Sequence, residues 1–204
     1  MEASKADISI VVVPLPAQGH LNQLLHLSVL LSSHALTVYY AAPAIHIHQA
    51  RSRLEGWPAS AIRSLRFHEL PIPPYASPAP NPNSLLFFPS HLLPMFQAFK
   101  HVQPHLANFL RFLSGTSRRV VVISDLLVSF AATEAAALPN GEPYTFRCTL
   151  PSSGLAWQHQ DSPAGALIRS LGLNTPLQKD CMPEEFLAHV AQCQSWRCFV
   201  PYLK

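Results

Sequence analysis

Two residues of this sequence have the chemistry of a general base and its carboxylate partner. His20 follows an apolar segment at residues 8–15, and Gly19 before it allows a sharp turn that would aim the ring outward. Asp125 ends a second apolar segment, residues 120–123. A neutral imidazole can take a proton at about pH 7, and a carboxylate on its other ring nitrogen would fix the tautomer and stabilise the imidazolium. These residue types therefore suit proton abstraction from a substrate.

The spacing alone leaves a structural explanation open for each of these residues. A His that opens a helix is often a capping or packing group, and an Asp at a strand end is often a helix cap or a turn residue. His20 and Asp125 lie far apart in the sequence. They can meet only if the fold brings the ends of their two segments together.

Strand and helix patterns alternate along the chain and define the elements that must position these residues. Strand patterns cover residues 8–15, 36–42, 65–70, 119–125 and 143–150. Helix patterns cover residues 21–33, 45–54, 91–113 and 130–138, with a weaker one at 183–193. The alternation predicts an α/β fold with a doubly wound parallel, Rossmann-like sheet. Ligands of such sheets bind beyond the carboxyl ends of the strands, so His20 and Asp125 should share one rim.

The composition excludes several classes of protein. Hydrophobic residues make up 49% and charged residues 12% of the 204 residues, which is enough for a packed core and argues against global disorder. The net charge is +3, and the basic residues are dispersed, so no nucleic-acid partner is expected. No apolar run is long enough to cross a bilayer. We therefore predict a cytoplasmic protein without a membrane partner.

Metal and cofactor motifs are absent from the sequence. His46 and His48 would share a face if their segment were a strand, but no third ligand follows at metal spacing, and the four cysteines contain no C-x-x-C pair. The turn after the first strand has one Gly instead of G-x-G-x-x-G, and no P-loop or G-x-S-x-G motif occurs. We predict no metal and no cofactor. A hydrolase that pairs His20 with Ser124 or Ser152 stays open, without a nucleophile elbow to support it.

The string Pro-Ala-Gln-Gly-His-Leu-Asn-Gln at residues 16–23 resembles the N-terminal signature of plant UDP-dependent glycosyltransferases. Within that family the chain is most similar to zeatin (cytokinin) O-glucosyltransferases. The similarity covers about residues 8–190 and includes the segments at 40–43, 68–71, 94–96, 130–136 and 180–182. The resemblance implies the N-terminal domain of a GT-B glycosyltransferase.

The resemblance also implies roles for individual residues. His20 matches the family's base, which deprotonates the acceptor hydroxyl, and Asp125 matches its carboxylate partner. Gly19 and Asn22 fall in the same signature and are expected at the substrate, together with His20. Ser152 is similar to a small hydroxyl residue that contacts the donor.

The family's activity gives an expected reaction and an alternative. The expected reaction transfers glucose from UDP-glucose to a hydroxyl of a small acceptor such as zeatin, by direct displacement that inverts the anomeric carbon. The long donor motif of the family's second domain is not in the sequence. We therefore predict an acceptor-binding domain at residues 1–190, a tail outside the family pattern at 191–204 and no donor domain. The alternative is a non-catalytic acceptor-binding half domain or an inactive truncated product.

Overall fold

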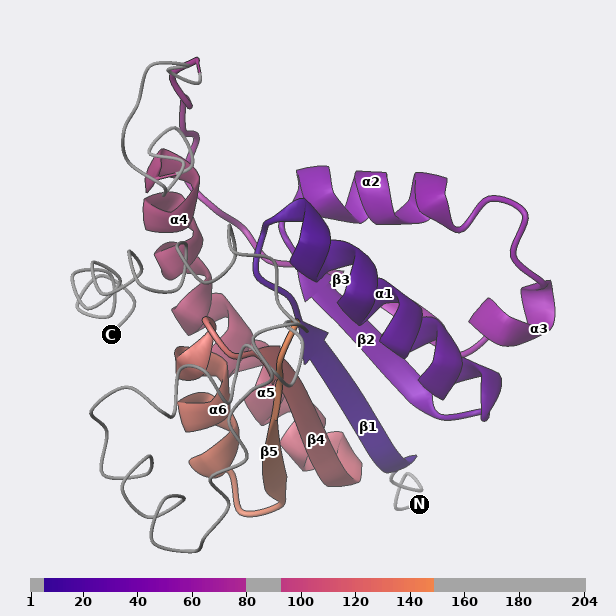
Figure 1. Cartoon of the computed structure of the whole chain (residues 1–204). Coiled ribbons are helices and arrows are strands. Elements are labelled where there is room, and N and C mark those ends of the chain that lie inside the picture. The colour runs from indigo at the N-terminus through magenta and orange to yellow at the C-terminus, as the bar shows by residue number, and fades with distance from the viewer. Residues whose placement is uncertain (1–5, 80–92, 149–204) are drawn as a thin grey trace, which may run out of the picture. The chain divides into compact units, whose positions relative to one another are not determined.

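Five strands form a single parallel sheet in the order β3-β2-β1-β4-β5 (Figure 1). The structure is a computed structural model and describes residues 6–79 and 93–148 of the chain. The strands are β1 (Ala6–Val13), β2 (Thr37–Ala42), β3 (Leu65–Glu69), β4 (Ser117–Asp125) and β5 (Gly141–Phe146). The helices are α1 (Gln18–Ser33), α2 (Ala44–Arg53), α3 (Ala59–Ile62), α4 (Leu93–Phe99), α5 (Gln103–Thr116) and α6 (Ser129–Ala136). The predicted α/β fold with a parallel sheet is confirmed.

Helices cover both faces of the sheet. Successive residues of a strand point to opposite faces, and in the central strands the residues on both faces are apolar. Val11 and Val13 of β1 pack into a core cluster with buried residues of α5 and α6 (Leu106, Leu110, Leu113, Ala131 and Ala135). Ile10 and Val12 pack into a second cluster with buried residues of α1 and α2 (Leu21, Leu24, Leu25, Ile47 and Ala50). This explains why β1 reads as a continuous β-branched run rather than as an alternating one.

The fifth strand begins two residues earlier in the chain than its sequence pattern indicated and ends four residues earlier. We expected residues 143–150, whereas β5 spans Gly141–Phe146 and residues 147 and 148 continue without strand pairing. Most side chains of β5 are at least partly exposed. The pattern of apolar residues that locates a buried strand is therefore weak in this segment.

Pro143 lies inside β5 because its backbone nitrogen faces away from the sheet. The carbonyl oxygens of Asn140 and Phe146 accept hydrogen bonds from the N–H groups of Val120 and Leu126. Neighbouring residues of a strand direct their backbone groups to opposite sides, so even-numbered positions of β5 face β4 and Pro143 faces outward. A proline, which has no N–H group, costs no ladder hydrogen bond at such an edge position.

The predicted helical region at residues 91–113 consists of two α-helices and a short 3₁₀ segment. A 3₁₀ turn, Lys100–Val102, separates α4 from α5, and Pro104 occupies the first turn of α5. A proline is tolerated there because the first N–H groups of a helix have no intrahelical partner. Pro104 therefore marks a helix boundary. The weak helix predicted at 183–193 lies outside the described residues.

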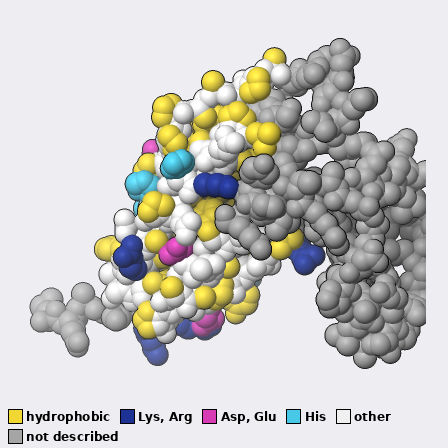
Figure 2. Space-filling model, turned by 90° about the vertical axis from the view of Figure 1, so that its left-hand side faces the viewer, with side chains coloured by type: hydrophobic (Ala, Val, Ile, Leu, Met, Phe, Trp, Pro, Cys, Tyr) yellow, Lys and Arg dark blue, Asp and Glu magenta, His cyan; other side chains and the backbone are white. Residues whose placement is uncertain are grey.

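The distribution of charged side chains and the lengths of the helices bear on the predicted absence of nucleic-acid and membrane partners. On the face drawn in Figure 2, basic and acidic side chains are dispersed among apolar and uncharged ones. Among the helices of the described residues, none is both long enough and apolar enough to cross a membrane. The cytoplasmic location stays a prediction.

An imidazole of β3 packs flat on α5 and gives the stability of the domain a pH dependence. The rings of His68 and Phe109 are stacked, with centroids 3.5 Å apart and planes inclined by 8°. Burial lowers the pKa of His68 below its ordinary value, so the folded state favours the neutral ring. The unfolded chain then binds a proton at a higher pH than the folded chain does.

We expect the free energy of unfolding to be highest above about pH 6.5 and to fall as the pH drops towards the lowered pKa of His68. The variant His68→Phe keeps an aromatic ring at the stack and removes the proton. Its unfolding free energy should therefore fall less steeply between about pH 7 and pH 5. Urea unfolding at several pH values measures both slopes. Burial also lowers the pKa of His46, so the variant should retain part of the slope, and equal slopes in the two proteins would contradict the prediction.

Candidate active site

The candidate site lies at the carboxyl ends of β1 and β4, where the strand order reverses. The chain runs from β1 outward to β3 and then returns to the other side of β1 as β4. Val13 at the end of β1 is in register with Ser124, the neighbour of Asp125. Crevices at such reversal points are the usual ligand sites of open α/β sheets.

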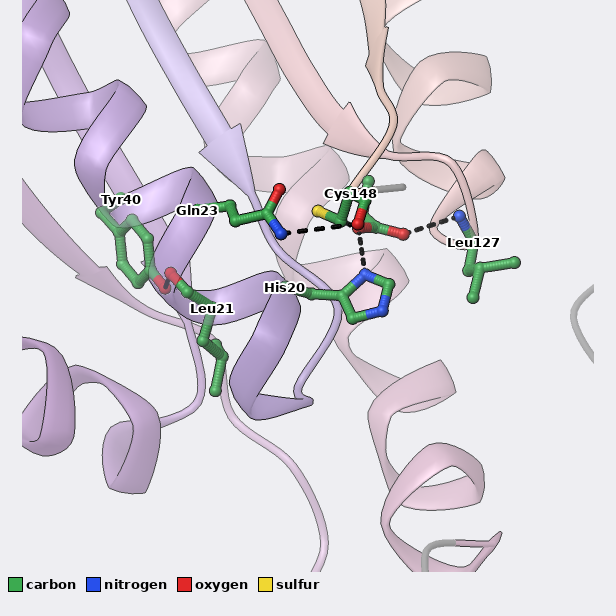
Figure 3. A network of polar contacts seen from close by, with 7 residues as sticks. His20, Leu21, Gln23, Tyr40, Leu127 and Cys148 are labelled. Atoms are coloured by element: carbon green, nitrogen blue, oxygen red, sulfur yellow. Dashed lines mark hydrogen bonds and ion pairs between the residues drawn. The ribbon is translucent and has the colours of Figure 1, made fainter. Parts of the chain in front are cut away.

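His20 and Asp125 are in direct contact at this edge. The Nδ1 atom of His20 lies 2.6 Å from Oδ2 of Asp125 (Figure 3). The Asp125 side chain is only 1% exposed, whereas that of His20 is 27% exposed. Because the carboxylate can only accept, an Nδ1–H group would donate to it and leave a lone pair on Nε2, which points away from the contact in Figure 3. Geometrically, the ring is therefore oriented as a proton acceptor that solvent or a ligand can reach.

Backbone and side-chain donors hold the Asp125 carboxylate in place. Its Oδ1 atom accepts a hydrogen bond of 2.9 Å from the N–H group of Leu127. Its Oδ2 atom also accepts the thiol hydrogen of Cys148, with Sγ at 3.2 Å. The turn after β4 is closed by a third bond, from the Val128 N–H to the Asp125 carbonyl at 2.9 Å. A carboxylate fixed at both oxygens can in turn fix the imidazole that contacts it.

Cys148 is a member of this cluster that the sequence analysis missed. Burial, and then the hydrogen bond and negative charge of Asp125, raise the pKa of its thiol to about 12, so the thiol is protonated at neutral pH. Gln23 of α1 donates a long hydrogen bond of 3.4 Å to the Cys148 carbonyl oxygen. The position of Cys148 just past the end of β5 is the signal that could have identified it. The signal was missed because the expected fifth strand ran through Cys148.

The other predicted site residues have mixed outcomes. Gly19 lies within the first turn of α1 without a positive φ, and no atom lies within 4 Å of the place a Cβ would take. The expected turn lies instead before Gly19, where the N–H group of Ala17 bonds to the carbonyl oxygen of Leu15, and the helix begins at Gln18. Asn22 is half-buried on α1, and within the described part of the chain its buried Oδ1 accepts no hydrogen bond. Ser152 lies outside the described residues.

Two alternatives from the sequence meet structural objections. Ser124 precedes Asp125 on β4, so its side chain lies on the opposite face of the sheet from the His20 contact. The segment containing His46 and His48 forms α2, where residues two apart do not share a face. His46 is buried and His48 is exposed. The condition for a shared face, a strand at this segment, is therefore not met, and the helix expected at residues 45–54 is present.

The sequence matches the family described as "Glycosyltransferase, N-terminal domain" over residues 6–200. The chain belongs to the plant UDP-dependent glycosyltransferases. It is 47% identical to cis-zeatin O-glucosyltransferase 1 of Zea mays over 182 residues, which are 89% of this chain and 38% of that enzyme. It is 40% identical to the zeatin O-glucosyltransferase of Phaseolus lunatus over 161 residues, 78% of this chain and 34% of that enzyme.

A solved glycosyltransferase structure supports the same fold. The structure of Glycyrrhiza uralensis UGT73P12 with glycyrrhetinic acid 3-O-monoglucuronide superposes with a TM-score of 0.55 at 18% identity. The match covers 85% of this chain and 32% of that one. The sheet is thus that of the N-terminal domain of a GT-B glycosyltransferase. The chain spans little more than a third of the length of its curated relatives, and the predicted boundary at residue 190 stays a prediction.

Proposed function

We propose that this chain provides the acceptor side and the general base of a UDP-glycosyltransferase. The reaction is transfer of glucose from UDP-glucose to a hydroxyl of a small acceptor such as zeatin. The observation that carries the proposal is the 2.6 Å contact between His20 and the buried Asp125, at the edge of the sheet where ligands of α/β folds bind. The substrate class is taken from the zeatin O-glucosyltransferases that the chain resembles.

Each residue of the pair has a distinct part in this reaction. The Nε2 atom of His20 takes the proton of the acceptor hydroxyl as the oxygen attacks the anomeric carbon of the sugar. Attack from the side opposite the UDP leaving group inverts that carbon. Asp125 does not take the proton; it holds the ring and stabilises the imidazolium that forms. A positioned base of this kind typically contributes about 10²–10⁴-fold to the rate.

The other residues proposed at the substrates follow from the resemblance to the family's signature. Asn22, one residue beyond the first turn of α1, has an amide oxygen without a partner among the described residues, and a hydroxyl of the acceptor would satisfy it. At Gly19 the open space beside the helix leaves room for a ligand to approach the backbone. Ser152 remains the proposed contact to the donor.

A second candidate is acceptor binding without sugar transfer. It is favoured by the extent of the match, since the chain spans 38% of the maize enzyme. In that case the domain would bind the same small molecules without turnover. The two candidates differ in whether UDP-glucose binds and whether a glucoside forms.

Calorimetric titration of the purified chain with trans-zeatin, cis-zeatin and UDP-glucose tests both candidates. The proposed function predicts binding of an acceptor and of UDP-glucose, with a zeatin glucoside detected by mass spectrometry. The second candidate predicts binding of an acceptor alone. His34→Ala is the matched control for a substitution of His20, because His34 is an exposed His at the far end of α1. Failure of every acceptor to bind would contradict both candidates.

A further inference from the structure

We propose that His20, Asp125 and Cys148 together form a binding site for Zn²⁺, and that metal binding there prevents His20 from accepting a proton. The binding of the metal is independent of the function proposed above. Only its inhibitory effect rests on that function. The site would give the domain a sensitivity to a thiophilic cation.

The donor atoms are already gathered. One ligand atom from each of the three residues lies within 4.8 Å of the other two, although the residues come from α1, the end of β4 and the segment after β5. Oδ2 of Asp125 is the common neighbour, at 2.6 Å from Nδ1 of His20 and 3.2 Å from Sγ of Cys148.

The two separations from Oδ2 of Asp125 are close to those of a tetrahedral zinc site. Zn²⁺ binds imidazole, carboxylate and thiolate ligands at about 2.0–2.3 Å, which places the ligand atoms about 3.3–3.7 Å apart. The His20–Asp125 distance must therefore lengthen by less than about 1 Å. The His20 side chain can make this adjustment because it is 27% exposed, whereas Asp125 is held. The fourth position would be open to water or to another ligand.

The surroundings of the carboxylate favour coordination. The Leu127 N–H group binds Oδ1 of Asp125 and so orients Oδ2 towards the other two ligands, as outer partners of metal ligands do. A set of one nitrogen, one oxygen and one sulfur suits Zn²⁺ and does not suit Mg²⁺ or Ca²⁺, which prefer oxygen ligands. The carboxylate and the thiolate also balance the two positive charges of the ion.

The proposed inhibition follows from the positions of the hydrogen atoms on Cys148 and His20 when the metal binds. The ion displaces the hydrogen of the Cys148 thiol, which leaves as a proton to solvent. It also takes the lone pair of Nδ1, so the single hydrogen of the neutral His20 ring must lie on Nε2. An Nε2–H group is a donor and cannot accept the proton of a hydroxyl. Metal binding and action of His20 as a base are therefore mutually exclusive.

Cobalt(II) titration of the full chain, without acceptor or UDP-glucose, tests the metal site directly. A Co²⁺ ion bound to a thiolate gives a sulfur-to-cobalt charge-transfer band, and Zn²⁺ should abolish it by competition. We expect the band in the wild-type chain and in Cys181→Ser, the matched cysteine control, and its loss in Cys148→Ser. The affinity for Zn²⁺ should fall at least about tenfold in Cys148→Ser and also in His20→Gln.

Several results would overturn the site. These are the absence of metal binding by the wild-type chain, an unchanged band in Cys148→Ser, or loss of the band only in Cys181→Ser. Circular dichroism of each variant separates loss of a ligand from loss of the fold, and His20→Gln supplies a second variant if Cys148→Ser does not fold. Where transfer is measurable, the ratio of rates with and without Zn²⁺ should fall in the wild-type chain and stay near one in Cys148→Ser. An absence of transfer would contradict the proposed function and leave the metal-binding result unaffected.

Discussion

Replacement of His20 by alanine is expected to slow glucosyl transfer by about 10²–10⁴-fold, because the acceptor hydroxyl then loses its base. The loss should be in kcat, because proton abstraction by His20 acts in the transition state rather than in substrate binding. The measurement is steady-state transfer by the chain, or by a fusion to the part of maize cis-zeatin O-glucosyltransferase 1 that the chain does not match. His34→Ala should retain the wild-type rate.

Asp125→Asn is expected to cause a similar loss by a different route. The amide oxygen can still accept the Leu127 N–H bond, which turns the amide nitrogen towards His20. That N–H group would donate to Nδ1 and leave the hydrogen of the ring on Nε2, the wrong tautomer for a base. The fold should survive, because asparagine has nearly the same shape as aspartate.

The effects of the two substitutions on the rate should not be additive, because both disrupt the same His20–Asp125 pair. The double variant His20→Ala/Asp125→Asn is expected to transfer glucose at a rate within about a factor of ten of that of the slower single variant. Multiplied losses in the double variant would show that Asp125 acts independently of His20. An unchanged rate in His20→Ala would overturn the assignment of the base.

Gly141→Ala is expected to destabilise the domain by about 1–3 kcal/mol or more. A Cβ atom on Gly141 would lie 2.0 Å from the backbone oxygen of Ala135 and 2.9 Å from Cβ of Leu138. The first of these is a main-chain atom at the end of α6, so no rotation of a side chain relieves the overlap. The last turn of α6 must move away from β5, and the buried contacts of both elements then weaken.

Gly115→Ala is the matched control for this prediction. Gly115 lies inside α5 with no atom within 4 Å of its missing Cβ, so alanine there should stabilise the domain by about 0.5–1 kcal/mol. Urea unfolding of the three proteins measures the difference. Equal midpoints for Gly141→Ala and the wild-type chain would contradict the packing of α6 against the start of β5.

The sequence located the ends of the first four strands to within two residues and those of β5 less well. β1 and β4 carry runs of β-branched residues because both of their faces are covered, and this pattern indicated where they lie. β5 is an edge strand of the described sheet with exposed side chains, so no buried pattern fixed its ends. Its displacement is the reason that Cys148 escaped attention.

The candidate site was predictable in part from the expected parallel sheet. The carboxyl ends of parallel strands meet at one edge, which placed His20 and Asp125 on a common rim, and the resemblance to glycosyltransferases implied that they are partners. The contact itself depends on β1 and β4 being neighbours, a strand order that local patterns do not specify. The turn expected at Gly19 lies before it, because a helix start and a sharp turn look alike in sequence, and the role of Gly19 at the substrate stays a proposal.

The pairing of β1 with β4 has a consequence for how the domain folds. His20 and Asp125 are 105 residues apart, and the buried hydrogen bond between Ser9 and Ser117, at 2.7 Å, joins positions 108 apart. Closing so long a loop costs chain entropy before its contacts repay it, so such pairings form slowly. The β1-α1-β2 and β2-α2-β3 units need only local closure. We therefore expect the His20–Asp125 contact to form late in folding, after the β1-α1-β2 and β2-α2-β3 units.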